Sequence, residues 1–213
     1  MTLVDRVADT IKAAIINARL LPGERLYEQE LSKSLGVSRT PLREAIQHLI
    51  AAGWVARLPG GGVSVSRLSR SEVVQVYQVR AVLEGLIARE AAVHLTDEQM
   101  AHVGELTQAM SEAAERGEEA TVKVGRSIHK YLRECTPNKI AAGILDQLHE
   151  RIDHYRHLTV LAPGRHKAAA EGHRELFEAL RSRDPDMAEA AMRRDILRAS
   201  EKLTEYSGIP DGD

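Results

Sequence analysis

Residues 36–46 read GVSRTPLREAI, and this stretch decides how the N-terminal part of the chain folds. Gly36 can adopt the positive φ of a tight turn, and Ser38 can cap the helix that follows it. Pro41 falls in the first helical turn, where its missing N–H costs little. The stretch therefore predicts a tight turn that leads into a helix over residues 39–52.

Two rows of side chains run along this predicted helix. The outer row carries Arg39, Arg43 and Gln47, and the other row is apolar and faces inward: Leu42, Ala45, Ile46 and Leu49. Arginine can donate two parallel hydrogen bonds to guanine or to a phosphate, and glutamine can read adenine. A helix with this outer row fits the major groove of DNA.

The flanking residues complete a winged helix-turn-helix. Helical spacing of apolar residues predicts helices over 4–18 and 28–35, the second of which precedes the turn. After the outer-row helix, residues 54–65 read WVARLPGGGVSV, which predicts a small β-hairpin. This hairpin would form a wing, whose glycines let the backbone approach a phosphate. Ser38 and Thr40 can donate to phosphate beside the free N–H groups of the helix start.

Charge supports an anionic partner for this part of the chain alone. Residues 1–69 hold 9 of the 29 basic and 6 of the 31 acidic residues, a net charge of +3. The remaining 20 basic and 25 acidic residues give the rest of the chain a net charge of −5. A nucleic acid should therefore meet the N-terminal part.

The stretch LPGERLYEQELSKSLGVSRTPLREAIQHLIAAGWV, residues 21–55, resembles the winged helix-turn-helix of GntR-family transcriptional regulators. The resemblance covers about residues 5–67. It implies DNA contacts from the following positions, to which the outer row adds Gln47: Gln29, Ser38, Arg39, Thr40, Arg43 and Gly61. Several family members carry arginine where Gln29 stands, so the phosphate contact there is expected to be weaker.

The rest of the chain reads as helices, and the whole is therefore mainly α. Predicted helices cover 70–94, 97–116, 119–135, 138–161, 165–182 and 185–206. We expect a winged helix-turn-helix domain over residues 1–68 and an all-helical bundle, for effector binding and dimerisation, over residues 69–213.

The helical part resembles the FCD branch of the same family. The matching segments are RAVLEGLIAREAA (80–92), SIHKYLRECTPN (127–138) and EGHRELFEALRSRDPDMAEAAMRRD (171–195). Six helices correspond to the shorter FCD form. The resemblance implies a dimer that binds a small organic acid, often beside a metal held by one Asp and three His residues.

This chain departs from the FCD metal pattern at two positions. Gly125 stands where the family has Asp, and Asp195 stands where it has the last His. The remaining set is His129, His173 and Asp195. His173 and Asp195 fall on apolar helical faces, and a buried unpaired carboxylate is unfavourable. The set suits Zn²⁺, Ni²⁺ or Mn²⁺; alternatively, Asp195 pairs with His173 or an arginine in a metal-free polar cluster.

Three further features bear on the effector. Arg80 is a candidate clamp for an effector carboxylate, or else a member of a surface or inter-domain ion pair. Arg133 lies one helical turn after His129 and could face the same cavity, so that His129, His173, Arg80 and Arg133 form the predicted effector site. Gly125 would leave room for a different or larger effector.

A row of potential ligands lies on the helix over residues 138–161: Asp146, His149, Asp153 and His157. Isoleucines and leucines on the opposing side suggest that this row is a solvated face or part of a subunit contact.

The preferred interpretation is a ligand-responsive regulator, not an enzyme, that binds double-stranded palindromic DNA as a homodimer. The absence of an apolar run of about 18 residues argues against a membrane partner, and the single Cys135 fits the cytoplasm. An alternative is a helical metalloenzyme that uses the His/His/Asp set, although no nucleophile–base pair is evident. A third is a protein-interaction module that has lost DNA affinity.

Overall fold

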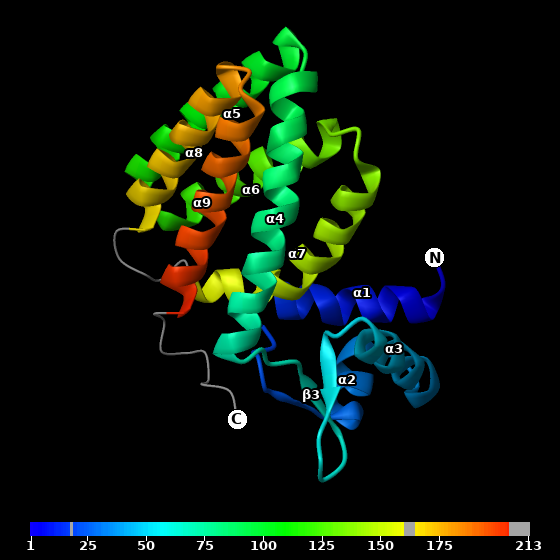
Figure 1. Cartoon of the computed structure of the whole chain (residues 1–213). Helices are drawn as coiled ribbons and strands as arrows, with labels where there is room; N and C mark the ends of the chain where they lie inside the picture. The colour runs from blue at the N-terminus through cyan, green and yellow to red at the C-terminus, as the bar shows by residue number, and fades with distance from the viewer. Residues whose placement is uncertain (18, 160–164, 205–213) are drawn as a thin grey trace. The chain divides into compact units, whose positions relative to one another are not determined.

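A computed structural model describes the backbone of residues 1–17, 19–159 and 165–204. It describes their side chains except those of 118–119, 122, 150–159, 165 and 202–204. The chain divides into two compact units (Figure 1). One holds Met1–Leu68 and groups with Arg151–His157, and the other holds Ser69–Glu150 and the chain from Leu158 onward.

The N-terminal unit is a winged helix-turn-helix. Its elements are α1 (Leu3–Ile16), β1 (Arg25–Leu26), α2 (Glu28–Leu35), α3 (Arg39–Ala51), β2 (Val55–Arg57) and β3 (Val63–Val65). The three strands form an antiparallel sheet in the order β1-β3-β2. The three helices and the hairpin confirm the prediction. The third strand, β1, was not predicted, because two residues carry no alternation of their own.

The core of this unit forms between α1 and α3. Val7, Ile11 and Ile15 of α1 are buried together with the predicted inward row of α3 and with Trp54. Burial of each large apolar side chain contributes about 1.5–3 kcal/mol. These contacts fix the rotation of α3, and its outer row is therefore exposed.

The turn before α3 depends on Gly36, whose φ of 65° lies in the left-handed region that favours glycine. Ser38 is the N-cap residue of α3, as predicted, but its side chain makes no capping hydrogen bond. The expectation that the Ser38 hydroxyl caps the helix is therefore wrong. Ser38 is exposed, and its hydroxyl can donate to a ligand outside the protein.

The C-terminal unit is built from α4 (Arg70–His94), α5 (Asp97–Arg116), α6 (Glu118–Cys135), α7 (Lys139–Thr159), α8 (Arg165–Arg181) and α9 (Pro185–Thr204). Where the predicted bounds fall on described residues, they differ from these by at most one residue, and the predicted ends at 161 and 206 lie outside the described residues. Two of the starts are capping boxes, in which Ser69 pairs with Glu72 and Thr96 with Gln99.

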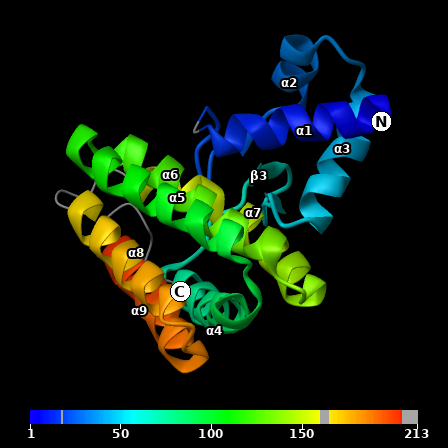
Figure 2. The ribbon, with the colours of Figure 1, turned by 90° about the horizontal axis from the view of Figure 1, so that it is seen from above.

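The helices of this unit pack side by side in a bundle. Helix α4 packs against α9, α5 packs against α6 and α8, and α8 packs against α9 (Figures 1 and 2). Helix α6 also contacts α4 and α8, so that α4, α6, α8 and α9 can all direct side chains to one place. In the described part of the chain, every helix is too short or too polar to cross a membrane.

Candidate functional site

The predicted DNA contacts lie on the surface of the N-terminal unit. All of them are exposed: Gln29, Ser38, Arg39, Thr40, Arg43, Gln47 and Gly61. Since α3 begins at Arg39, its first-turn N–H groups lie beside Ser38 and Thr40. The arrangement gives a row of donors along one edge of α3, which is a geometry that suits a polyanion.

The two arginines of α3 differ in their partners. Arg43 donates from Nε to Glu28 Oε2 over 2.8 Å, and both side chains remain accessible to solvent. Among the residues that the structure describes, Arg39 makes no hydrogen bond or ion pair. Arg39 is therefore free to bind a ligand, whereas Arg43 is held along one edge by an acid that the sequence did not single out.

The wing is also tied to α3 and to β1. Arg57 of β2 donates to Gln47 Oε1 over 2.6 Å. Arg25 of β1 donates to the carbonyl oxygen of Gly61 over 3.1 Å, at the wing tip where φ of Gly61 is 87°. Arg25 and Arg57 add two exposed cations to the surface. The place of Arg57 directly before the Gly-rich turn could have indicated it, whereas Arg25 reaches the wing only through the pairing of β1 with β3.

In the C-terminal unit, the structure brings His129, His173 and Asp195 together from three helices. One potential ligand atom of each lies within 4.8 Å of the others. His129 Nε2 lies 3.6 Å from Asp195 Oδ2, and the two imidazole centroids are 5.1 Å apart. All three side chains are nearly buried, with residue exposures of 5–9%. The two histidines and the acid that sequence reasoning selected thus form one cluster.

The tautomer of His173 follows from its hydrogen bond. Its Nδ1 lies 2.8 Å from the carbonyl oxygen of Ala169, which can only accept, so Nδ1 carries the proton. In the described part of the chain, His173 Nε2 is buried without a hydrogen-bond partner. A buried imidazole lone pair of this kind, on a ring oriented by a backbone carbonyl, has the geometry of a metal ligand.

Glu84 of α4 is the centre of a larger buried network. Its carboxylate accepts from Arg80 Nη2 over 2.7 Å, and it lies 2.6 Å from His129 Nδ1 and 3.0 Å from His149 Nε2. Glu84 and Arg80 each expose only 1% of their surface. The Arg80 guanidinium is therefore engaged inside the protein, in an ion pair within α4. The predicted alternative of a surface or inter-domain ion pair is wrong about the location, because both partners are buried on one helix.

The burial of His149 contradicts the prediction for its helix. His149 exposes only 7% of its surface, so the row that contains it is not a solvated face at this point. Ile140 and Ile144 are exposed instead, whereas Ala141 and Leu145 are buried, which places the inward face of α7 on the His149 side. The side chains of Asp153 and His157 lie outside the described residues.

Electrostatics favour ionised carboxylates in this network. Burial raises the pKa of Glu84, but Arg80 and His129 outweigh it and hold that pKa well below its usual value. Burial also raises the pKa of Asp195, and the two neighbouring imidazoles lower it further than burial raises it. Burial lowers the pKa of His129, yet Glu84 and Asp195 raise it overall, whereas burial keeps the pKa of His173 low. Glu84 and Asp195 are therefore ionised, His173 is a neutral imidazole, and His129 favours the protonated form.

Two glycines of this region differ in the room around them. A Cβ on Gly125 would lie 3.5 Å from His173 Nε2 and 3.5 Å from Met110 Cε, which are ordinary contacts. The predicted space at Gly125 thus accommodates a methyl group beside His173. A Cβ on Gly172 would clash with Asp195 Oδ1, so Gly172 allows the carboxylate to approach α8.

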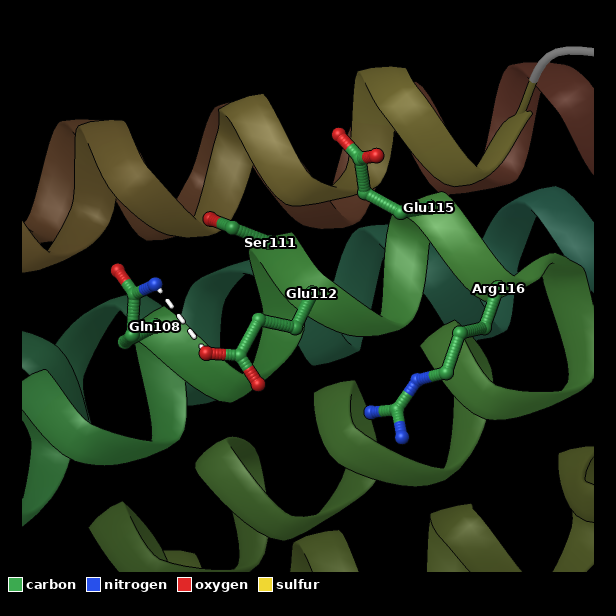
Figure 3. A pocket seen from close by; sticks show the side chains of 5 residues that line it. All are labelled: Gln108, Ser111, Glu112, Glu115 and Arg116. Atoms are coloured by element: carbon green, nitrogen blue, oxygen red, sulfur yellow. Dashed lines mark hydrogen bonds between the residues drawn. The ribbon is translucent and has the colours of Figure 1, made fainter.

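The other predicted effector residue, Arg133, is part of a contact between α6 and α7. It donates from Nε to Asp146 Oδ1 over 3.1 Å, and its side chain is 12% exposed. A separate, open hollow of about 510 Å³ lies on α5 (Figure 3). Its lining includes Glu112, Glu115 and Arg116 and none of the clustered residues, and its two carboxylates make it a poor site for an acid.

Comparison with known families agrees with both units. The model described as "Bacterial regulatory proteins, gntR family" matches residues 3–65, and that of the FCD domain matches residues 75–198. The second match alone spans more than half of the chain.

Relatives of similar length carry regulator names. The HTH-type transcriptional regulator YdhC of Bacillus subtilis is 27% identical over 84% of this chain and 80% of its own length. The probable D-xylose utilization operon transcriptional repressor of Paenarthrobacter nicotinovorans is 29% identical over 90% and 84%. The solved structure of E. coli McbR/YncC superposes with a TM-score of 0.77 at 22% identity, over 96% of this chain and 98% of that one. This last likeness shows the fold.

Proposed function

Because the chain belongs to the GntR family of DNA-binding transcriptional regulators and carries an FCD domain, we propose that a small organic acid controls its binding, as a dimer, to a palindromic operator. Binding to the operator is supported by the exposed row of hydrogen-bond donors on α3, which faces outward because the opposite face of the helix is buried. Effector binding is supported by the buried cluster of His129, His173 and Asp195.

In this proposal α3 enters the major groove. Arg39 and Arg43 contact base edges or phosphates, and Ser38, Thr40 and Gln29 contact the backbone. The Oε1 atom of Gln47 already accepts from Arg57, so Gln47 presents mainly its amide NH₂ group as a donor. The wing glycines would allow the backbone near Gly61 to approach the duplex.

Replacing Arg39 or Arg43 with alanine is expected to weaken operator binding by about 1–3 kcal/mol each, because each removes a guanidinium contact. Titration of a labelled operator, selected from a random duplex library with the wild-type protein, measures the change. Arg181→Ala is the matched control, since Arg181 is an exposed arginine of α8 paired with Glu178. Equal operator affinities of the wild type and both α3 variants would show that Arg39 and Arg43 do not contact the operator.

The buried cluster fits a divalent metal. His173 Nε2 offers a lone pair without a partner in the described part of the chain, and the nearby Asp195 and His129 supply a carboxylate and a second imidazole. This donor set suits Zn²⁺, Ni²⁺ or Mn²⁺. Glu84 holds the Nδ1 side of His129, which leaves Nε2 on the Asp195 side. When bound, the ion would supply a positive centre for an effector carboxylate.

The other two predicted effector residues, Arg80 and Arg133, are already engaged in ion pairs within the protein. Because Arg80 is paired with Glu84, an effector carboxylate would have to replace Glu84 at the Arg80 guanidinium. Arg133 is engaged with Asp146 at the junction of α6 and α7. We therefore place the effector beside His129 and His173. Its binding changes DNA affinity only to the extent that it binds one arrangement of the protein better than another.

The outer face of α4 is a candidate dimer surface. Val79, Val82 and Val93 expose 48%, 52% and 57% of their surface, and they recur at helical spacing. In a symmetric dimer each residue is buried twice, so Val82→Asp should raise the dimer dissociation constant at least about tenfold. Sedimentation equilibrium measures this constant. Ala101→Asp adds the same charge to an exposed position on another helix, α5, and an equal effect of both changes would place the interface elsewhere.

The same cluster would also suit a metalloenzyme. The names of the relatives favour regulation, and the winged helix-turn-helix would have no part in such an enzyme.

A further inference from the structure

A carboxylate lies within the basic surface that we assign to DNA. Glu28 opens α2, and its Oε2 accepts the Nε–H of Arg43 on α3 over 2.8 Å. The side chains expose 36% and 63% of their surface, so neither is locked inside the protein. An acid at this place requires an explanation, because it repels the phosphates that the surrounding donors attract.

The geometry of the ion pair suggests what the acid does. Glu28 takes the Nε edge of the guanidinium, which leaves N–H groups of the outer edge available for a second acceptor pair. Guanine presents such a pair through O6 and N7 in the major groove. A guanidinium that is held before binding also loses less side-chain freedom when it meets a base.

We propose that Glu28 is a positioning residue for sequence recognition, which holds Arg43 toward a base edge and away from the phosphates. This inference rests on the proposed contact of Arg43 with DNA. It assigns two opposite effects to one carboxylate: Glu28 lowers affinity for any duplex by its charge, and it raises discrimination at the base pair that Arg43 contacts.

The chain offers a matched control in Glu30. Glu28 and Glu30 both lie in the first turn of α2, so both carboxylates interact with the same helix dipole. Glu30 is exposed and, among the described residues, makes no hydrogen bond or ion pair. Glu28→Gln and Glu30→Gln remove the same charge from the same turn, and only the first removes the carboxylate that pairs with Arg43.

The experiment uses the full-length protein. Wild type, Glu28→Gln, Glu30→Gln, Arg43→Ala and the Glu28→Gln/Arg43→Ala double variant are titrated with the selected operator and with an unrelated duplex. Each titration is repeated at several salt concentrations. A second selection from the random library gives the base preference of each variant at every operator position. Thermal unfolding of each variant verifies that the fold is retained.

Both single glutamine variants should bind the unrelated duplex more tightly than wild type, by similar factors. Glu30→Gln should keep the operator preference, whereas Glu28→Gln should lower the ratio of operator to unrelated affinity at least about fivefold. The lost preference should be confined to one base pair in each half-site. In the Arg43→Ala background, Glu28→Gln should change this ratio no further.

Parallel behaviour of Glu28→Gln and Glu30→Gln, with Arg43→Ala still weakening operator binding, would overturn the positioning role and leave the proposed function standing. A uniform loss of preference across all operator positions would likewise overturn it. If Arg43→Ala leaves the operator affinity unchanged, both the proposed DNA contact of Arg43 and the proposed role of Glu28 are wrong.

Discussion

Glu84→Ala should lower the free energy of unfolding of the helical unit by about 3–5 kcal/mol, because it leaves the Arg80 charge buried without this carboxylate. The same change removes the acceptor beside His129 Nδ1 and His149 Nε2. The guanidinium would then stay buried without the carboxylate whose attraction offsets its desolvation. Urea unfolding of the full-length protein, followed by circular dichroism, measures the loss.

Two variants separate this effect from a general sensitivity to substitution. Glu134→Ala removes an exposed carboxylate that pairs with Lys130 one turn earlier, and it should cost less than about 1 kcal/mol. The double change Arg80→Met/Glu84→Leu removes both charges and should recover much of the lost stability. A loss below about 1 kcal/mol for Glu84→Ala would show that the network does not depend on this carboxylate.

His173→Ala should weaken metal binding at least about 100-fold, since only His129 and Asp195 would remain of the set. It should also abolish the response of DNA binding to the effector. Operator affinity without effector should stay unchanged, because the DNA contacts belong to the other unit. Competition between the protein and a chelating dye for Zn²⁺ measures the metal affinity. Operator titration with and without the effector measures the DNA affinity and its response to the effector.

The control for this change is His102→Ala, which removes an exposed imidazole that pairs with Glu105. Circular dichroism shows whether the His173 variant folds. A variant that folds and keeps both its Zn²⁺ affinity and its effector response would place the pocket elsewhere in the helical unit.

The helices could be predicted from the sequence because their ends are local features. Ser69 with Glu72 and Thr96 with Gln99 are capping boxes that can be read without knowing what packs against them. The outer row of α3 could be predicted for a similar reason, since its apolar face has four clear members. The pairing of His173 with Asp195 was partly visible, because both polar residues interrupt apolar rows.

The Glu84 network could not be predicted, since its members come from three helices. On α7, Ile144 and Leu145 suggested an inward face opposite the row of Asp146 and His149. Leu145 is buried as expected, yet Ile144 is exposed, and His149 turns inward to meet Glu84. Charge complementarity between helices, which spacing within one helix does not reveal, decided the rotation. The pairing of Arg43 with Glu28 was missed for the same reason, because α2 and α3 meet only after the turn at Gly36 closes.

The proposed regulator depends on duplex DNA binding by the exposed edge of α3. Its most direct test is the affinity of the full-length protein for its selected operator and for an unrelated duplex, measured from dilute to physiological salt. We expect tighter binding to the operator and a linear fall of log affinity with log salt, with a slope of about 0.9 per phosphate contact. Failure to bind either duplex even in dilute buffer would contradict it.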